Sequence, residues 1–105
     1  MSSVQDKCPN TTTIAKFFGE VQEGKHVDEV LRSYFPDYSY KGVFFDVGAF
    51  EPIRISNSHH FHLNGWKVYS FEANPAKIPL LKQHRDHVFR DCLKRFLNFI
   101  FSKIK

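Results

Sequence analysis

Apolar residues along the middle of the chain predict strands that alternate with helices. Residues 43–47 form a nearly continuous apolar run, which is typical of a strand buried on both faces. Residues of alternating character over Lys67–Glu72 predict a second strand, in which successive side chains point to opposite faces. His87–Phe89 predicts a short third strand, so the expected order is β-α-β-α-β with parallel strands.

Two helices are expected between these strands. Ser56 or Asn57 caps the first, which runs through Asn64 and ends at Gly65. Asn74-Pro75 opens the second, because proline at a helix start sacrifices no hydrogen bond. A second proline, Pro79, fits only if it also lies in a first turn.

Two further apolar stripes with helical spacing precede the first strand. A threonine among residues 11–13 is expected to cap a helix that ends near Gly24 and carries Ile14, Phe17, Phe18 and Val21. A second helix, stopped by Pro36, is expected to carry Val27, Val30, Leu31, Tyr34 and Phe35. These elements predict an α/β fold: a partial Rossmann-like sheet with N-terminal helices and a C-terminal amphipathic helix.

Length and charge narrow the functional classes. The 105 residues suffice for one domain. The net charge of +4 belongs entirely to residues 90–105, and residues 1–89 sum to zero, so a basic groove for nucleic acid is not expected. Cys8 and Cys92 form no ligand motif or disulfide framework. The polar N-terminus and the absence of a long apolar run favour a cytoplasmic protein.

The residues that follow the first two strands suit a nucleoside. Gly48-Ala49 allows a tight turn and a close approach of the backbone to a ligand, and Asp46 lies just before it. Glu72 ends the second strand at the edge where open α/β sheets bind ligands. A carboxylate there accepts hydrogen bonds from both ribose hydroxyls. The absence of a full GxGxxG pattern counts against NAD, whose pyrophosphate needs such a glycine-rich turn.

Residues 42–89 resemble the FkbM family of S-adenosylmethionine-dependent methyltransferases. The matching motifs are Phe45-Asp46-Val47-Gly48-Ala49-Phe50, Ser56-Asn57, Asn64-Gly65-Trp66 and Phe71-Glu72-Ala73-Asn74-Pro75, with Gln22-Glu23-Gly24 upstream. One departure is Pro52, which stands where many methyltransferases have a second glycine and donates no backbone N–H.

The resemblance implies methyl transfer from S-adenosylmethionine to an acceptor. The usual acceptor group in that family is a hydroxyl. The residues expected to bind this cofactor are Asp46, Gly48, Ala49, Glu51, Glu72 and Asn74. No catalytic base is identified. The family's strand-rich second half does not follow Phe89, so we expect a truncated chain whose activity as an enzyme is uncertain.

The alternative is a non-catalytic fragment that binds cofactor, a partner or a membrane surface. Residues 90–105 predict a basic amphipathic helix, which either covers the core or docks on a partner or an anionic membrane. The expected organisation is therefore a helical lead-in over residues 1–41, a cofactor-binding unit over 42–89 and a tail over 90–105. No metal site is expected, because His59, His60 and His62 have no further ligand nearby at suitable spacing.

Overall fold

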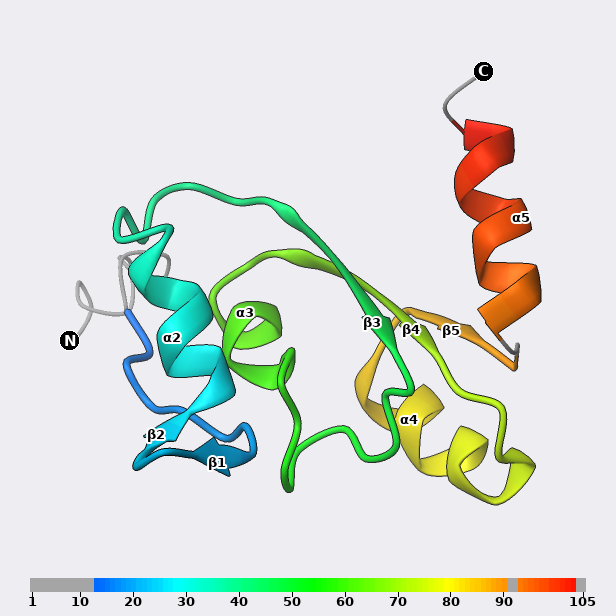
Figure 1. Ribbon diagram of the computed structural model, residues 1–105, viewed down its shortest axis with the longest axis horizontal. Coiled ribbons are helices and arrows are strands. Elements are labelled where there is room, and N and C mark those ends of the chain that lie inside the picture. Colours follow the sequence, from blue (N-terminus) through cyan, green and yellow to red (C-terminus); the bar gives the residue numbers. More distant parts are fainter. Residues whose placement is uncertain (1–12, 91–92, 104–105) are drawn as a thin grey trace, which may run out of the picture.

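The computed structural model describes residues 13–90 and 93–103 and is a small mixed α/β fold (Figure 1). Three parallel strands form one sheet in the order β3-β4-β5, comprising Val43–Val47, Lys67–Phe71 and His87–Phe89. Val43 pairs with Lys67, and Tyr69 pairs with His87. These bounds confirm the three strands that the sequence predicts, to within one residue.

The helices that connect the strands lie on one side of the sheet (Figure 1). They are α3 (His59–Leu63) and α4 (Ile78–His84), the latter preceded by the 3-10 turn η2 (Pro75–Lys77). Phe61 of α3 packs on Phe44 of β3 with ring centroids 5.4 Å apart, and both Phe61 and Leu81 of α4 are 1% exposed. The core therefore lies between the sheet and this helical layer.

The opposite face of β3 is not buried in the described part of the chain. Val43, Phe45 and Val47 are 56%, 41% and 45% exposed. The prediction of a strand buried on both faces is therefore wrong, because the described crossover helices cover only one face. The apolar run in the sequence reports strand propensity, but it does not show that two layers enclose the strand.

Side-chain oxygens and prolines set the helix starts. Asn74 accepts a hydrogen bond from the Ala76 N–H at 3.0 Å, and a proline occupies the first turn of both η2 and α4, as expected. Helix α3 begins later than expected, with Ser58 as its N-cap. The Ser56 hydroxyl nevertheless accepts from the N–H groups of Ser58 and His59, which are among the donors exposed at the helix start.

The first predicted helix is wrong for the described residues. Residues 13–20 contain no helix, and β1 (Val21–Gln22) then pairs antiparallel with β2 (Lys25–His26). Thr11 and Thr12, two of its expected caps, lie outside the described residues. The Asp28 carboxylate accepts from the backbone N–H of Phe18 at 2.7 Å and of Gly19 at 3.0 Å. A tertiary acceptor thus replaces helical hydrogen bonding in this segment.

Helix α2 (Val27–Ser33) is present, but it buries the polar face rather than the apolar stripe. Asp28 is 0% exposed and Arg32 is 4% exposed, whereas Val30 is 42% exposed and Tyr34 just beyond the helix is 73% exposed. The Arg32 guanidinium lies 3.9 Å from the Tyr38 ring centroid and donates to His60 Nε2 at 3.0 Å. Hydrogen bonding and cation–π contact compensate the buried charge, so the polar face is inward.

Helix α5 (Leu93–Lys103) follows the sheet, as the C-terminal stripe predicts. Leu97 and Phe101 are 42% and 59% exposed, and they stand one helical turn apart. Within the described residues, none of the helices combines the length and the apolar character needed to cross a membrane.

Candidate functional site

The carboxyl ends of β3 and β4 meet at the candidate site. The N–H groups of Gly48 and Ala49 both donate to the Phe71 carbonyl, at 2.7 Å and 3.1 Å, so the turn after β3 is fastened to the end of β4. Gly48 has a φ of +74°, and a Cβ built there meets no atom within 4 Å. The glycine is therefore required by the backbone conformation and leaves open space above the turn.

Glu72 joins the two strand ends. Its Oε1 accepts from the Phe50 N–H at 2.7 Å, and its Oε2 accepts from the Asn74 N–H at 2.9 Å. Glu72 is only 8% exposed. Each carboxylate oxygen accepts one backbone hydrogen bond and retains a second lone pair. The carboxylate is thus held in position by the backbone, and it keeps acceptor capacity for hydroxyl donors.

Phe50, whose backbone N–H donates to this carboxylate, has a strained backbone conformation. Its φ is +61°, which is uncommon for a residue other than glycine, and its side chain is 45% exposed. The Lys77 ammonium lies 4.1 Å from its ring centroid. An exposed aromatic ring, a glycine turn and a fixed carboxylate therefore come together at one sheet edge.

Asp46 faces the helical layer instead of the strand ends. Its Oδ2 accepts a hydrogen bond from the Ser58 hydroxyl, and the residue is 9% exposed. Burial raises the pKa of Asp46, and the Ser58 hydrogen bond and the positive charge of Arg85 oppose this shift. Asp46 accordingly ties β3 to the start of α3.

The other three expected contacts have partners within the chain. Ala49 is 4% exposed, and the Asn74 side chain caps η2. Glu51 forms ion pairs with Arg54 and Lys77, each at 3.2 Å, and the Lys77 hydrogen bond lowers the pKa of Glu51. The structure therefore brings Gly48, Ala49 and Glu72 together, with Glu51 and Asn74 on the flanking segments and Asp46 beneath.

Arg85 is an organising residue that the sequence does not reveal. It is 5% exposed, and its Nη2 donates to the Pro52 carbonyl at 2.6 Å and to His59 Nδ1 at 3.1 Å. It thereby links the end of α4 to the β3–α3 loop and to the start of α3. Only the length and direction of α4 bring Arg85 to this position, and no local motif encodes them.

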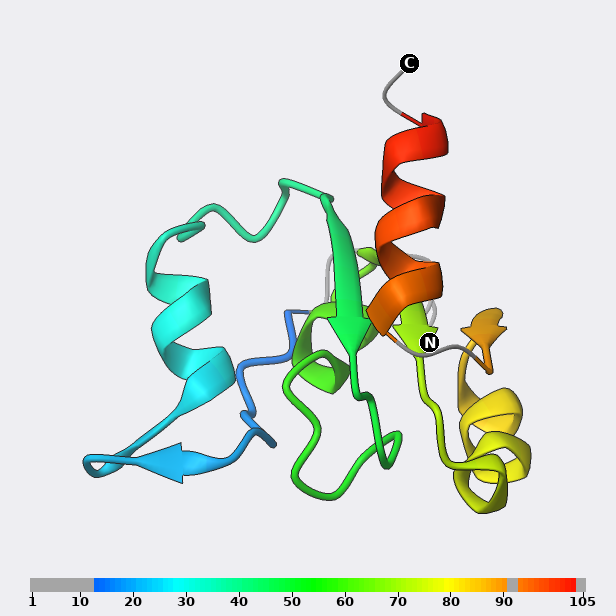
Figure 2. The same cartoon turned by 45° about the vertical axis from the view of Figure 1, so that its right-hand side comes forward.

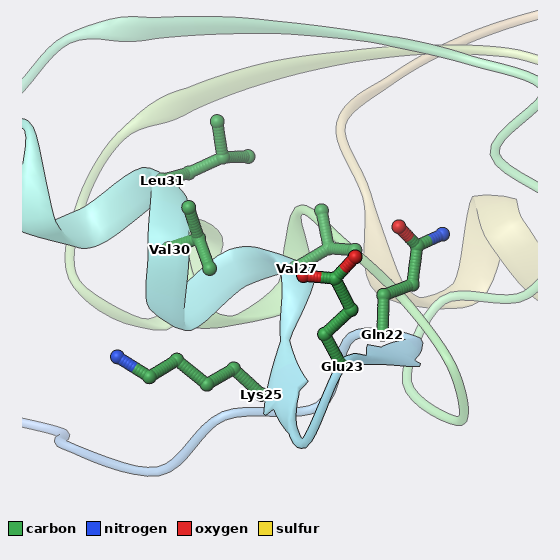
Figure 3. Close-up of a pocket in the computed structure, with 6 residues that line it drawn as sticks. All are labelled: Gln22, Glu23, Lys25, Val27, Val30 and Leu31. Carbon is green, nitrogen blue, oxygen red and sulfur yellow. The ribbon is translucent and has the colours of Figure 1, made fainter.

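The two described hollows lie apart from these residues. One, of about 330 Å³, lies between the β1–β2 hairpin and α2 (Figure 3) and is lined by Gln22, Glu23, Lys25, Val27, Val30 and Leu31. The other, of about 300 Å³, is lined by Phe35, Pro36, Asp37 and Tyr40. Neither hollow is lined by a nucleophile together with a base. We therefore place the candidate site at the strand ends because of the residues found there and not because of the size of a cavity.

Histidines gather at α3 without forming a metal centre. His59 and His62 stack with ring centroids 6.0 Å apart. Among residues 13–90 and 93–103, no group of three or more His, Cys, Asp or Glu side chains is arranged to hold a metal ion. The His60 Nδ1–H donates to the Lys16 carbonyl at 2.8 Å, which secures the N-terminal segment to α3.

Acidification is expected to destabilise the fold through His59. Burial, assisted by the Arg85 charge, lowers the pKa of His59 from 6.5 to about 4. The unfolded chain binds this proton near pH 6.5, whereas the folded chain resists it until about pH 4. The stability that neutral His59 contributes above pH 6.5 is therefore lost as the pH falls from 6.5 to about 4. Urea unfolding at stepped pH should show a loss on the order of 2–3 kcal/mol from this residue.

His59→Asn provides the matched test of this pH dependence, because its amide oxygen preserves an acceptor for Arg85 and does not titrate. The variant should lose stability less steeply between pH 6.5 and 4 than the parent chain. Lys82→Asn, at an exposed position on α4, is the control and should retain the parent slope. Equal slopes for all three chains would contradict the assignment to His59.

The chain matches no protein-family model, no curated protein and no solved structure.

Proposed function

We propose that the chain binds S-adenosylmethionine at the carboxyl ends of β3 and β4, as the donor half of an FkbM-type methyltransferase with a Rossmann-like sheet. The observation that carries the proposal is the fixed Glu72 carboxylate beside the open Gly48 turn. Ligands of open α/β sheets bind outside the carboxyl ends of the strands. Cytoplasmic localisation remains a prediction from the sequence.

The residues present fit the nucleoside part of this cofactor. The remaining lone pairs of Glu72 suit the two ribose hydroxyls, and the exposed Phe50 ring suits stacking with adenine. The open space at Gly48 suits close approach of the methionine portion. Bound cofactor supplies an electrophilic methyl group, and the contribution of this chain is to hold and orient it.

Glu72→Ala is expected to weaken binding of S-adenosylhomocysteine by about 5- to 150-fold, equivalent to about 1–3 kcal/mol, because the ribose hydroxyls lose their acceptor. Calorimetric titration measures this difference. Circular dichroism must first show that the variant remains folded, since Glu72 also accepts from Phe50 and Asn74. Glu20→Ala, at an exposed carboxylate outside the site, is the control and should bind like the parent chain. Equal affinity for the folded Glu72 variant would remove Glu72 from the site.

A second candidate function is attachment of α5 to an anionic membrane or a partner. Leu97 and Phe101 expose apolar side chains one turn apart on a helix from the basic end of the chain. Replacing both with glutamate should reduce co-sedimentation with vesicles rich in anionic lipid. Val30→Glu, at an exposed valine on α2, is the control. Undiminished sedimentation of the double variant would exclude this surface.

A further inference from the structure

Phe50 is held at two points next to the proposed nucleoside site. Its backbone N–H donates to Glu72 Oε1 at 2.7 Å, and the Lys77 ammonium lies over its ring, 4.1 Å from the ring centroid. A φ of +61° is costly for phenylalanine, and such a conformation persists where surrounding contacts hold it. The residue is nevertheless 45% exposed. Phe50 thus combines an accessible aromatic ring with a fixed position.

Lys77 bridges the segments that follow the two strands. It is the last residue of η2, which follows β4, whereas Phe50 belongs to the loop after β3. Figure 2 shows both segments leaving the sheet beyond the arrowheads of β3 and β4. Glu51, next to Phe50, accepts from the Lys77 ammonium at 3.2 Å and pairs through its other oxygen with Arg54, also at 3.2 Å. The ammonium therefore has an anionic anchor on the same loop as the ring.

The ion pair keeps the ammonium in place over the ring. The Lys77 hydrogen bond lowers the pKa of Glu51, so this carboxylate is ionised at neutral pH. The side chains of Lys77 and Glu51 are 27% and 17% exposed. An ion pair near the surface contributes little to folding by itself. The cation–π contact gives this pair a further effect, because it fixes the direction in which the Phe50 ring faces.

We propose that Lys77 is a positioning residue for the nucleoside and acts through Phe50, an inference that rests on the proposed function. The ammonium covers one face of the ring and leaves the other face for a stacked base. Glu72, which holds the Phe50 backbone, also offers its remaining lone pairs to the ribose hydroxyls. Base and ribose therefore meet groups that are already fixed relative to each other, and binding orders fewer side chains.

Calorimetric titration with S-adenosylhomocysteine tests the effect on binding. Lys77→Met should weaken binding roughly two- to tenfold, because the ring must then be ordered when the ligand binds. Lys77→Arg keeps a cation over the ring and should bind like the parent chain. Lys82→Met, at an exposed lysine on α4, is the control and should also bind like the parent chain. In a Phe50→Leu background, Lys77→Met should cause no further loss, whereas a purely structural effect of Lys77 would remain.

Nuclear magnetic resonance of the free chain tests the contact without any cofactor. The ε-methylene protons of Lys77 should resonate upfield of those of the other lysines, because the ring current of Phe50 shields protons that lie over its face. The Lys77 signal is identified by its loss in Lys77→Arg. Phe50→Leu should return the signal to the position of the other lysines.

The two measurements separate failure of this inference from failure of the proposed function. An ordinary Lys77 signal in the free parent chain overturns the inference, whether or not the chain binds cofactor. Equal affinity of the parent and the folded Lys77→Met variant also overturns it, while binding by the parent leaves the proposed function intact. A parent chain that shows the upfield signal but binds no S-adenosylhomocysteine contradicts the proposed function, and with it any role of Lys77 in binding.

Discussion

Replacing Asp28 with alanine is expected to destabilise the fold by about 2–4 kcal/mol, because two backbone donors lose their acceptor in a buried position. Asp28 is 0% exposed, and its carboxylate holds the N–H groups of Phe18 and Gly19. The space is also closely filled, since a Cβ at Gly19 would lie 2.7 Å from Asp28 Oδ1. Urea unfolding followed by circular dichroism measures the loss.

Asp28→Asn is the matched comparison, because it retains one oxygen acceptor and should cost less than alanine. Glu29→Ala, at the neighbouring position on α2, serves as the control for helix propensity and surface charge. If Asp28→Ala and Glu29→Ala are equally stable, the N-terminal segment does not depend on the Asp28 carboxylate.

Arg85→Met should also be strongly destabilising, by about 3 kcal/mol or more, because Asp46 is left buried without its nearby positive charge. Arg85 is 5% exposed, and its hydrogen bonds to Pro52 and His59 hold the β3–α3 loop against the helices. The Arg85 charge also opposes the burial that raises the pKa of Asp46. The variant should therefore unfold at a lower urea concentration, and its deficit should shrink as Asp46 is protonated at acidic pH.

Arg85→Lys separates charge from geometry, because it preserves the positive charge but cannot reproduce the guanidinium contacts. Its stability should fall between the parent and Arg85→Met. Lys82→Met, at an exposed position on the same helix, is the control and should change stability little. A parent-like Arg85→Met variant would show that the loop is held by other contacts.

Local signals in the sequence predict the sheet and its flanking helices well. A proline in the first turn of α4, the Asn74 cap and the apolar periods at β3 and β4 all act over a few residues. Each signal reflects backbone chemistry that does not depend on distant packing. The three parallel strands therefore follow from the sequence alone.

Tertiary contacts decide the features that the sequence predicts wrongly. The stripe at residues 14–21 has helical spacing, yet Asp28 supplies competing acceptors and residues 13–20 contain no helix. Helix α2 has an apolar stripe, yet its polar face is buried, because Arg32 contacts the Tyr38 ring and donates a hydrogen bond to His60. Both outcomes depend on partners outside the segment whose pattern makes the prediction.

The candidate site likewise contains some residues that the sequence predicts and others that it does not. Gly48 and Glu72 are predictable, because the ends of parallel strands meet at one edge of a sheet. Ser58 and Arg85 are not, because their contacts with Asp46 and Pro52 depend on how α3 and α4 pack. Asp46, which the sequence also assigns to the cofactor, accepts a hydrogen bond from Ser58 and so connects β3 to this helical layer.

Calorimetric titration of the parent chain with S-adenosylhomocysteine tests the central claim most directly. The fixed Glu72 carboxylate beside the open turn at Gly48 predicts saturable heat with one ligand bound per chain. The folded Glu72→Ala variant should show weaker binding in the same titration. Absence of binding heat from the folded parent chain at millimolar ligand would contradict the proposal that these strand ends hold the cofactor.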